Sequence, residues 1–254
     1  MLDYSQRIWL IVFLVALILP SMAATRDSAR VIILKAIKAQ GGTEKIARLR
    51  IMRIKAEGTM TVSPDQANCP VIFEDIWQMP TRYRSTLTMQ LIDGTITQTQ
   101  VIDGDTGWIQ VNNQPAQRMS REALAEMKEQ KYAEDLDRLL FLNDKTITLS
   151  ILEEIMINEK PATGVLVKSK GHREVSLYFE TGSGLLVKRI QHVKDDERGK
   201  EVMQEVTFSD YREKDGVNYY RHITMSREGV IVVDAKLTEV KVLSKVDDKL
   251  FALP

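Results

Sequence analysis

Hydrophobic and polar positions alternate with a period of two along most of the chain, a pattern that predicts strands with one buried face. The first run follows Arg50 and puts on one side Met52, Ile54, Ala56, Met60 and Val62. Extended segments lie on both sides of Pro80, and the second of them alternates polar residues with Tyr83, Leu87, Met89 and Leu91. Asp-Gly pairs and charged turns separate the runs, which predicts hairpins. This succession favours an antiparallel meander over a fold that alternates strands and helices.

Two segments change to a helical period. Residues 25–40 carry a broad apolar face. Gly41 and Gly42 are expected to end this helix, and a short helix then starts with Thr43 as its N-cap. Residues 120–142 predict a longer central helix that is capped by Ser120. Its apolar stripe consists of Leu124, Met127, Tyr132, Leu136, Leu139 and Leu140.

These elements predict a mainly β fold of the α+β class, an incomplete antiparallel β-barrel of roughly eleven to twelve strands. The N-terminal helix and the central helix are expected to cover its concave apolar face. Two helices are too few to cover the whole apolar face of so many strands. We therefore expect an apolar cavity between the helices and the sheet. The candidate lining residues are Met60, Tyr83, Leu87, Met89, Leu124, Met127 and Leu136. The alternative is that side chains fill this space, as in most large sheets.

The first residues have the layout of a secretory signal peptide. A short, weakly basic start leads into an apolar run over residues 8–19, and small residues follow Pro20. This run is shorter than the about 20 residues that a transmembrane helix needs, although an uncleaved anchor is the alternative. We predict cleavage after about Ala23, so that residues 1–23 are the signal peptide and residues 24–254 form a single domain. The expected location is the periplasm or the exterior of the cell.

Charge and residue chemistry narrow the classes of function. The chain has 35 basic residues (Lys and Arg) and 35 acidic residues (Asp and Glu). It therefore lacks the excess of basic residues that would indicate a nucleic-acid partner. Cys69 is the single cysteine, so no internal disulfide can form. His172, His192 and His222 lack the spacing of a metal site, and we expect no metal and no cofactor. No combination of acid, base and nucleophile supports a catalytic residue or a named reaction.

Several short motifs together resemble the LolA-like superfamily of envelope lipoprotein carriers. They are Pro80, Tyr83 and Arg84 in "QMPTRYRS", Asp103, Gly104 and Trp108 in "IDGDTGW", the strand pairs "VSLYFETGSGLLVKRI" and "VTFSDYREKDGVNYYRHI", and Phe251 with Pro254. These motifs extend over nearly the whole segment that follows the signal peptide. The last strand pair and the ending look like divergent members described as outer-membrane lipoprotein-sorting proteins.

The resemblance implies an open antiparallel barrel with helices as a lid over an apolar cavity. It also implies that acyl chains occupy the cavity and that the protein carries them across the periplasm without catalysis. The corner at the lid would consist of Met79, Pro80, Arg82, Arg84 and Trp108. In the family's carriers an arginine precedes the proline and helps to hold the lid shut, whereas Met79 takes that place here. Strand alternation sends Arg82 and Arg84 to the same, polar side.

We therefore expect a non-enzymatic cell-envelope protein, a monomer that binds a hydrophobic ligand such as a lipid or an acylated lipoprotein. Inner- or outer-membrane lipoprotein-sorting components are the expected partners, with a role in transport or as a chaperone. One alternative is a structural or interaction module with a filled core and no ligand. Another is an enzyme that uses the same cavity without a recognisable motif.

Overall fold

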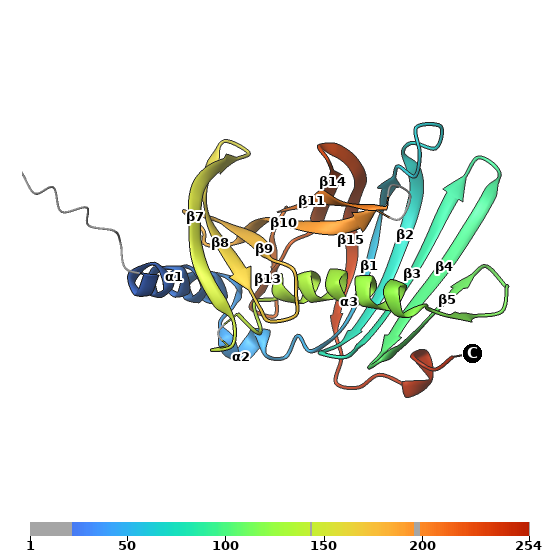
Figure 1. Ribbon diagram of the computed structural model, residues 1–254, viewed down its shortest axis with the longest axis horizontal. Helices are drawn as coiled ribbons and strands as arrows, with labels where there is room; N and C mark the ends of the chain where they lie inside the picture. The colour runs from blue at the N-terminus through green and yellow to red at the C-terminus, as the bar shows by residue number, and fades with distance from the viewer. Residues whose placement is uncertain (1–21, 143, 196–198, 254) are drawn as a thin grey trace, which may run out of the picture.

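Thirteen strands pair into one antiparallel sheet that curves around a central helix without closing (Figure 1). The computed structural model describes residues 22–142, 144–195 and 199–253, and every element named below lies within them. The order of the sheet is β6-β5-β4-β3-β2-β1-β15-β14-β11-β10-β9-β8-β7, so β6 and β7 are its two edges. The predicted fold class, an open antiparallel barrel with a few helices, is confirmed, with thirteen strands in the sheet where eleven or twelve were expected.

The strands form two series of neighbours that are joined in the middle of the sheet. The first series is β1 (Ile51–Met60), β2 (Cys69–Gln78), β3 (Arg82–Leu91), β4 (Gly94–Asp103), β5 (Thr106–Val111) and β6 (Gln117–Arg118). The second is β7 (Thr148–Ile157), β8 (Lys160–Lys168), β9 (Val175–Glu180), β10 (Leu186–Asp195) and β11 (Lys200–Ser209). The remaining strands are β12 (Arg212–Lys214), β13 (Val217–Tyr219), β14 (His222–Arg227) and β15 (Val230–Val242). β15 pairs with β1 and β14 and thereby joins the two series, while β12 and β13 form a separate ribbon.

Two helices cover one face of the sheet. α1 (Met22–Gln40) lies against β7 and β8, and α3 (Arg121–Leu136) crosses the middle (Figure 1). A short α2 (Thr43–Ile46) follows α1, and a one-turn 3-10 helix (Asp248–Leu250) lies near the end of the chain. Most of the predicted signal peptide, residues 1–21, lies outside the described residues. Among the described helices, none is long and apolar enough to cross a membrane.

The N-terminus of α2 differs from the sequence prediction. Gly42 occupies the N-cap position, and Thr43 is the first helical residue, so the predicted Thr43 cap is wrong. No side-chain hydrogen bond caps this helix. Gly42 has a φ of 90°, a backbone conformation that glycine adopts at little cost and that turns the chain between the two helices.

α3 begins where the sequence predicts and ends earlier. The Ser120 hydroxyl accepts a hydrogen bond from the Ala123 N–H at 3.1 Å, which confirms the predicted cap. The helix ends at Leu136 rather than at residue 142, because Leu139 has a left-handed φ of 60° that breaks the helical repeat. The turns that follow bury the Leu139 and Leu142 side chains in the core.

The sheet packs solidly under α1. The buried face of this helix repeats at helical spacing and consists of Ala29, Ile33, Ala36 and Ile37. These side chains belong to a core cluster that includes Leu149, Val165, Val167, Leu177 and Phe179 from β7, β8 and β9. Because α1 covers only this end, the remaining part of the same face depends on α3 for its cover.

Candidate functional site

A cavity of about 310 Å³ lies between α3 and the concave face of the sheet. Strands β1–β4 line one side of it, and β10, β11, β14 and β15 line the other. Most of the wall is apolar and consists of Ile54, Ala56, Met60, Phe73, Trp77, Leu87, Val206, Phe208, Ile223, Met225, Val233 and Leu237. A concave, mostly apolar pocket with a few polar groups is the usual form of a small-molecule site.

Strand register arranges the lining residues in rows across the sheet. Phe73 pairs with Leu87, and two residues further along the strands Asp75 pairs with Ser85. Successive inward positions therefore pass from an apolar row to a polar row, because side chains two apart on a strand share a face. The polar row continues into β4, where Gln100 pairs with Ser85 and also lines the cavity.

Charged side chains from α3 and the sheet meet at one side of the cavity, and we call Asp75, Glu134, Asp137 and Arg189 the polar floor. Burial raises the pKa of Asp75 to about 7, hydrogen bonds from Ser85 and Tyr83 oppose this shift, and the negative charge of Glu134 adds to it. The Tyr83 hydroxyl donates to Asp75 Oδ1 at 3.4 Å. Burial also raises the pKa of Glu134.

Asp137 and Arg189 form a buried ion pair within the polar floor. Burial raises the pKa of Asp137 to about 6, and the attraction of Arg189 only partly offsets it. The pair leaves hydrogen-bonding capacity unused, since Asp137 Oδ1, Arg189 Nε and the neighbouring Glu134 Oε2 have no partner in the protein. A buried polar atom without a partner is costly, so this side of the cavity suits a polar guest.

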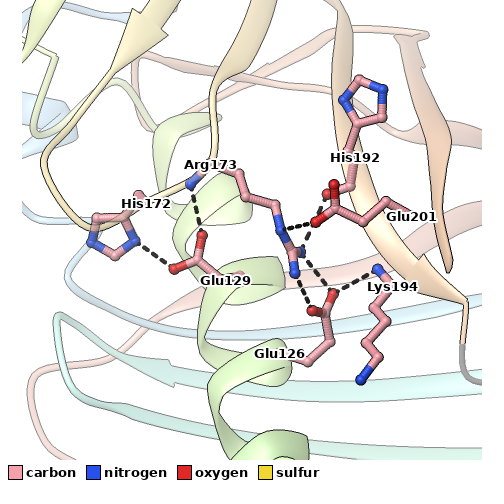
Figure 2. A network of polar contacts seen from close by, with 7 residues as sticks. All are labelled: Glu126, Glu129, His172, Arg173, His192, Lys194 and Glu201. Carbon is pink, nitrogen blue, oxygen red and sulfur yellow. Dashed lines mark hydrogen bonds and ion pairs between the residues drawn. The ribbon is translucent and has the colours of Figure 1, made fainter. Parts of the chain in front are cut away.

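Figure 2 shows how the first half of α3 is attached to the second series of strands. Arg173, just before β9, makes two hydrogen bonds to the Glu126 carboxylate at 2.9 and 2.5 Å and an ion pair with Glu201 at 3.0 Å. The Glu129 carboxylate accepts from the Arg173 N–H at 3.0 Å and lies 2.8 Å from His172 Nδ1. Burial alone would raise the pKa of Glu126, and the hydrogen bonds from Arg173 and from the Lys194 N–H lower it overall.

The second half of α3 reaches the first series of strands. Lys131 Nζ donates to the Pro80 carbonyl at 3.1 Å and forms a buried ion pair with Asp135. Just after the helix, the Arg138 guanidinium lies 4.3 Å from the centre of the Trp77 ring, a cation–π contact. α3 therefore bridges the two halves of the curved sheet by polar contacts at both of its ends.

A second hollow of about 430 Å³ lies beside α3, next to the turn between β2 and β3. Its lining includes Pro80, Ile102, Lys131, Phe141 and His172. Strands and α3 enclose the first cavity on more sides, whereas this second hollow is a wider groove. We therefore take the cavity under α3 as the candidate site.

Solved structures identify the fold. A LolA superfamily protein from Nitrosomonas europaea superposes with a TM-score of 0.55 at 13% identity, over 88% of this chain and 97% of that one. A putative outer membrane lipoprotein-sorting protein domain from Vibrio parahaemolyticus gives 0.53 at 11% identity, over 86% and 97%. A DUF1329 family protein from Desulfovibrio piger gives 0.52 at 9% identity, over 88% and 97%. The chain has a LolA-like fold. No known protein family and no curated protein matches the sequence itself.

The LolA-like fold brings together some of the predicted cavity residues. Met60, Tyr83 and Leu87 line the 310 Å³ cavity. The other four predicted residues lie near it without lining it. Met89 packs with the buried Cys69 and Val71, Leu124 and Met127 pack on the cluster around Trp77 and Tyr83, and Leu136 is buried in the main core.

The predicted corner residues divide between the two faces of the LolA-like fold. Met79 is buried beside Trp77 on the α3 side, and Pro80 borders the groove described above. Arg82, Arg84 and Trp108 lie on the opposite face and line neither the cavity nor the groove, and for the two arginines this agrees with the side that strand alternation predicts. Alternation along β3 and β5 explains this, because Arg84, Val101 and Trp108 form one cross-strand row that faces away from α3.

On that opposite face, the three residues hold the end of the chain. Arg82 Nη1 pairs with Asp248 at 2.5 Å, and Arg84 Nη1 donates to the Leu250 carbonyl at 3.0 Å. Trp108 Nε1 donates to the Phe251 carbonyl at 3.2 Å, and the Phe251 side chain is fully buried. These residues therefore have a structural role that the sequence pattern did not indicate.

Sequence reasoning missed the polar floor entirely. The available signal was a charged residue at an inward strand position. Asp75 lies two residues from both Phe73 and Trp77 and therefore shares their inward face. Glu134 on α3 and its C-cap residue Asp137 are three residues apart, a spacing that puts both on one side of the helix. Within the described residues, no group of three or more His, Cys, Asp or Glu side chains is arranged to hold a metal ion.

Proposed function

We propose that this protein is a non-enzymatic binding protein of the cell envelope that holds a hydrophobic ligand, a lipid or the acyl chains of a lipoprotein, under α3. The observation that carries the proposal is the 310 Å³ cavity with its mostly apolar wall. The filled-core alternative is disfavoured because the same helix and sheet surfaces enclose open volume instead of packed side chains.

The LolA-like fold supports the proposal, because one of the similar structures is a putative outer membrane lipoprotein-sorting protein domain. We propose that residues 1–23 are an export signal and that residues 24–254 act as one domain in the periplasm or outside the cell. A carrier would exchange its ligand with lipoprotein-sorting components of the inner or outer membrane. The volume lies at the small end of the roughly 300–1,000 Å³ range of ligand pockets, so a ligand with several acyl chains would require α3 to move.

Ligand binding can be tested by filling the cavity. Met225 lines the cavity and is half-buried, so Met225→Trp would place an indole ring in the ligand's space. We expect the wild-type protein to carry co-purified lipid detectable by mass spectrometry and to enhance the fluorescence of an uncharged naphthylamine probe. Met225→Trp should lower the affinity for that probe about tenfold or more, since the ring excludes it sterically.

The matched control is Met203→Trp on β11, because Met203 is exposed and does not line the cavity. This variant should bind the probe as the wild type does. If both variants bound the probe equally, or if the wild type had neither co-purified lipid nor affinity for the probe, the proposed binding function would be wrong.

A further inference from the structure

The polar floor has no role in binding a purely apolar chain, yet its four side chains line the cavity. Burying ionisable groups there is unfavourable, as the raised pKa values of Asp75 and Asp137 show. The apolar wall alone would hold a hydrocarbon chain. A cavity that is apolar along one part and polar at one side is instead matched to an amphiphile, which has a chain and a polar end.

Unpartnered atoms of four lining side chains describe the polar end that would fit. Two of the atoms accept hydrogen bonds, Glu134 Oε2 and Asp137 Oδ1. The other two donate, Trp77 Nε1 and Arg189 Nε. Asp137, Arg189 and Trp77 are each more than nine-tenths buried, so bulk water does not serve them. A group that both donates and accepts hydrogen bonds, such as a hydroxyl or an amide, complements this set.

The charges around these atoms are already balanced. Asp137 is paired with Arg189, and the Arg138 guanidinium lies 3.5 Å from Asp135. Arg227, the third arginine that lines the cavity, donates to Gln204 Oε1 at 3.0 Å. An anionic ligand would place a further negative charge beside Glu134 and Asp75, whose carboxyls already disfavour each other's ionisation. A cationic ligand would lie beside Arg138 and Arg189. At the polar floor, either charge would be removed from water without a free counter-ion of its own, which costs free energy.

We infer that the polar floor binds the uncharged hydroxyl or amide end of a single-chain amphiphile, such as a monoacylglycerol, while its chain lies along the apolar wall. This inference rests on the proposed function and specifies its ligand. Glu134 and Asp137 accept hydrogen bonds from the head group, and Arg189 and Trp77 donate to it. The cavity volume agrees with one chain, because it is near the lower limit for ligand pockets.

Three probes with the same chain and different head groups test the inference. Protein purified from cells that express the full chain would be titrated calorimetrically, near neutral pH, with monolauroylglycerol, laurate and dodecylamine. Monolauroylglycerol should bind at least about tenfold more tightly than either charged probe. Glu134→Gln removes one negative charge at constant shape, so it should improve laurate binding and reduce the preference for the uncharged probe. Glu57→Gln, at an exposed position of β1, is the matched control and should leave the preference unchanged.

Asp75→Asn provides a second route to the same result if Glu134→Gln fails to fold, because it also lowers the negative charge of the polar floor. Equal or tighter binding of laurate or dodecylamine to the wild type would overturn the inference and leave the proposed function standing. Binding of none of the three probes would overturn both. An unchanged preference in folded Glu134→Gln and Asp75→Asn would also contradict the assignment to the polar floor.

Discussion

α1 and α3 cover the same face of one sheet, and they do so in opposite ways. The buried face of α1 consists of alanine and isoleucine residues, and the sheet beneath it is packed solid. The end of α3 and the two residues just after it present Glu134, Asp137 and Arg138, and the sheet beneath them encloses a cavity. Both helices lie across strands with inward apolar residues. The chemistry of the helix face therefore decides whether this fold is solid or hollow at a given place.

The physical reason is the hydration of charged groups. Short apolar side chains on α1 can interdigitate with valines and leucines of the strands at no polar cost. The Glu134 carboxylate at the end of α3 and the Asp137 carboxylate just after it cannot be pressed against an apolar wall without losing free energy. The space between them and the wall stays open, and the contacts of Lys131 with Pro80 and of Glu126 with Arg173 hold α3 in place above it.

The largest expected effect concerns packing. Ile33 on α1 is fully buried, and Ile33→Ala should lower the free energy of unfolding by roughly 2–4 kcal/mol because it leaves a new void in a solid core. Ile223, which already faces the cavity, is the matched position. Ile223→Ala should lower it by about 1 kcal/mol, mostly the lost transfer free energy. Urea unfolding measures both values, and equal losses would show that the region under α3 is packed in solution.

The next effect concerns charge. The pKa of Asp75 is raised from 3.8 to about 7, so the folded state binds its proton more tightly than the unfolded state does. Ionised Asp75 therefore opposes folding at high pH, and wild-type stability should fall as the pH rises from about 4 to about 7. Tyr83, Ser85, Glu134 and Arg138 face this carboxyl and set the size of the effect.

Asp75→Asn removes the ionisation and should be more stable than the wild type at about pH 8, by on the order of 2 kcal/mol. The difference should shrink as the pH falls and disappear near about pH 3, where the wild-type carboxyl is protonated in both states. The control is Asp93→Asn in the exposed β3–β4 hairpin, which should follow the wild-type profile. A stability difference for Asp75→Asn that does not change with pH would mean that the carboxyl is not buried in the folded protein.

Strand alternation predicts the open sheet and part of its inward face, because the pairing of Phe73 with Leu87 follows from a local period of two. Strand alternation does not identify Asp75 as an inward residue, because a charged residue at such a position interrupts the apolar pattern from which the inward face is predicted. Helical periodicity predicts the start of α3 and does not show which of its faces borders the cavity. The contact between Trp108 and Phe251 joins residues 143 positions apart, and no local pattern encodes such a contact.

The smallest expected effect concerns the attachment of α3. Glu126→Gln keeps the shape of the side chain and removes the charge that Arg173 binds, so the free energy of unfolding should fall by about 1 kcal/mol. Hydrogen bonds to the charged form lower the pKa of Glu126, so the wild-type contribution is present above the ordinary carboxyl range and is lost as the pH falls through it. The exposed pair of Glu174 with Lys168 is the matched control, and Glu174→Gln should change stability by less.

Amide hydrogen exchange distinguishes the two helices in this experiment. Because Glu126 attaches the first half of α3 to the second series of strands through Arg173, Glu126→Gln should speed exchange along α3 and leave exchange along α1 unchanged. The solid packing of α1 on β7 and β8 does not depend on Arg173. Faster exchange in both helices would show that they open together as one cooperative unit, and the contrast between a solid and a hollow half of the sheet would then not extend to their dynamics.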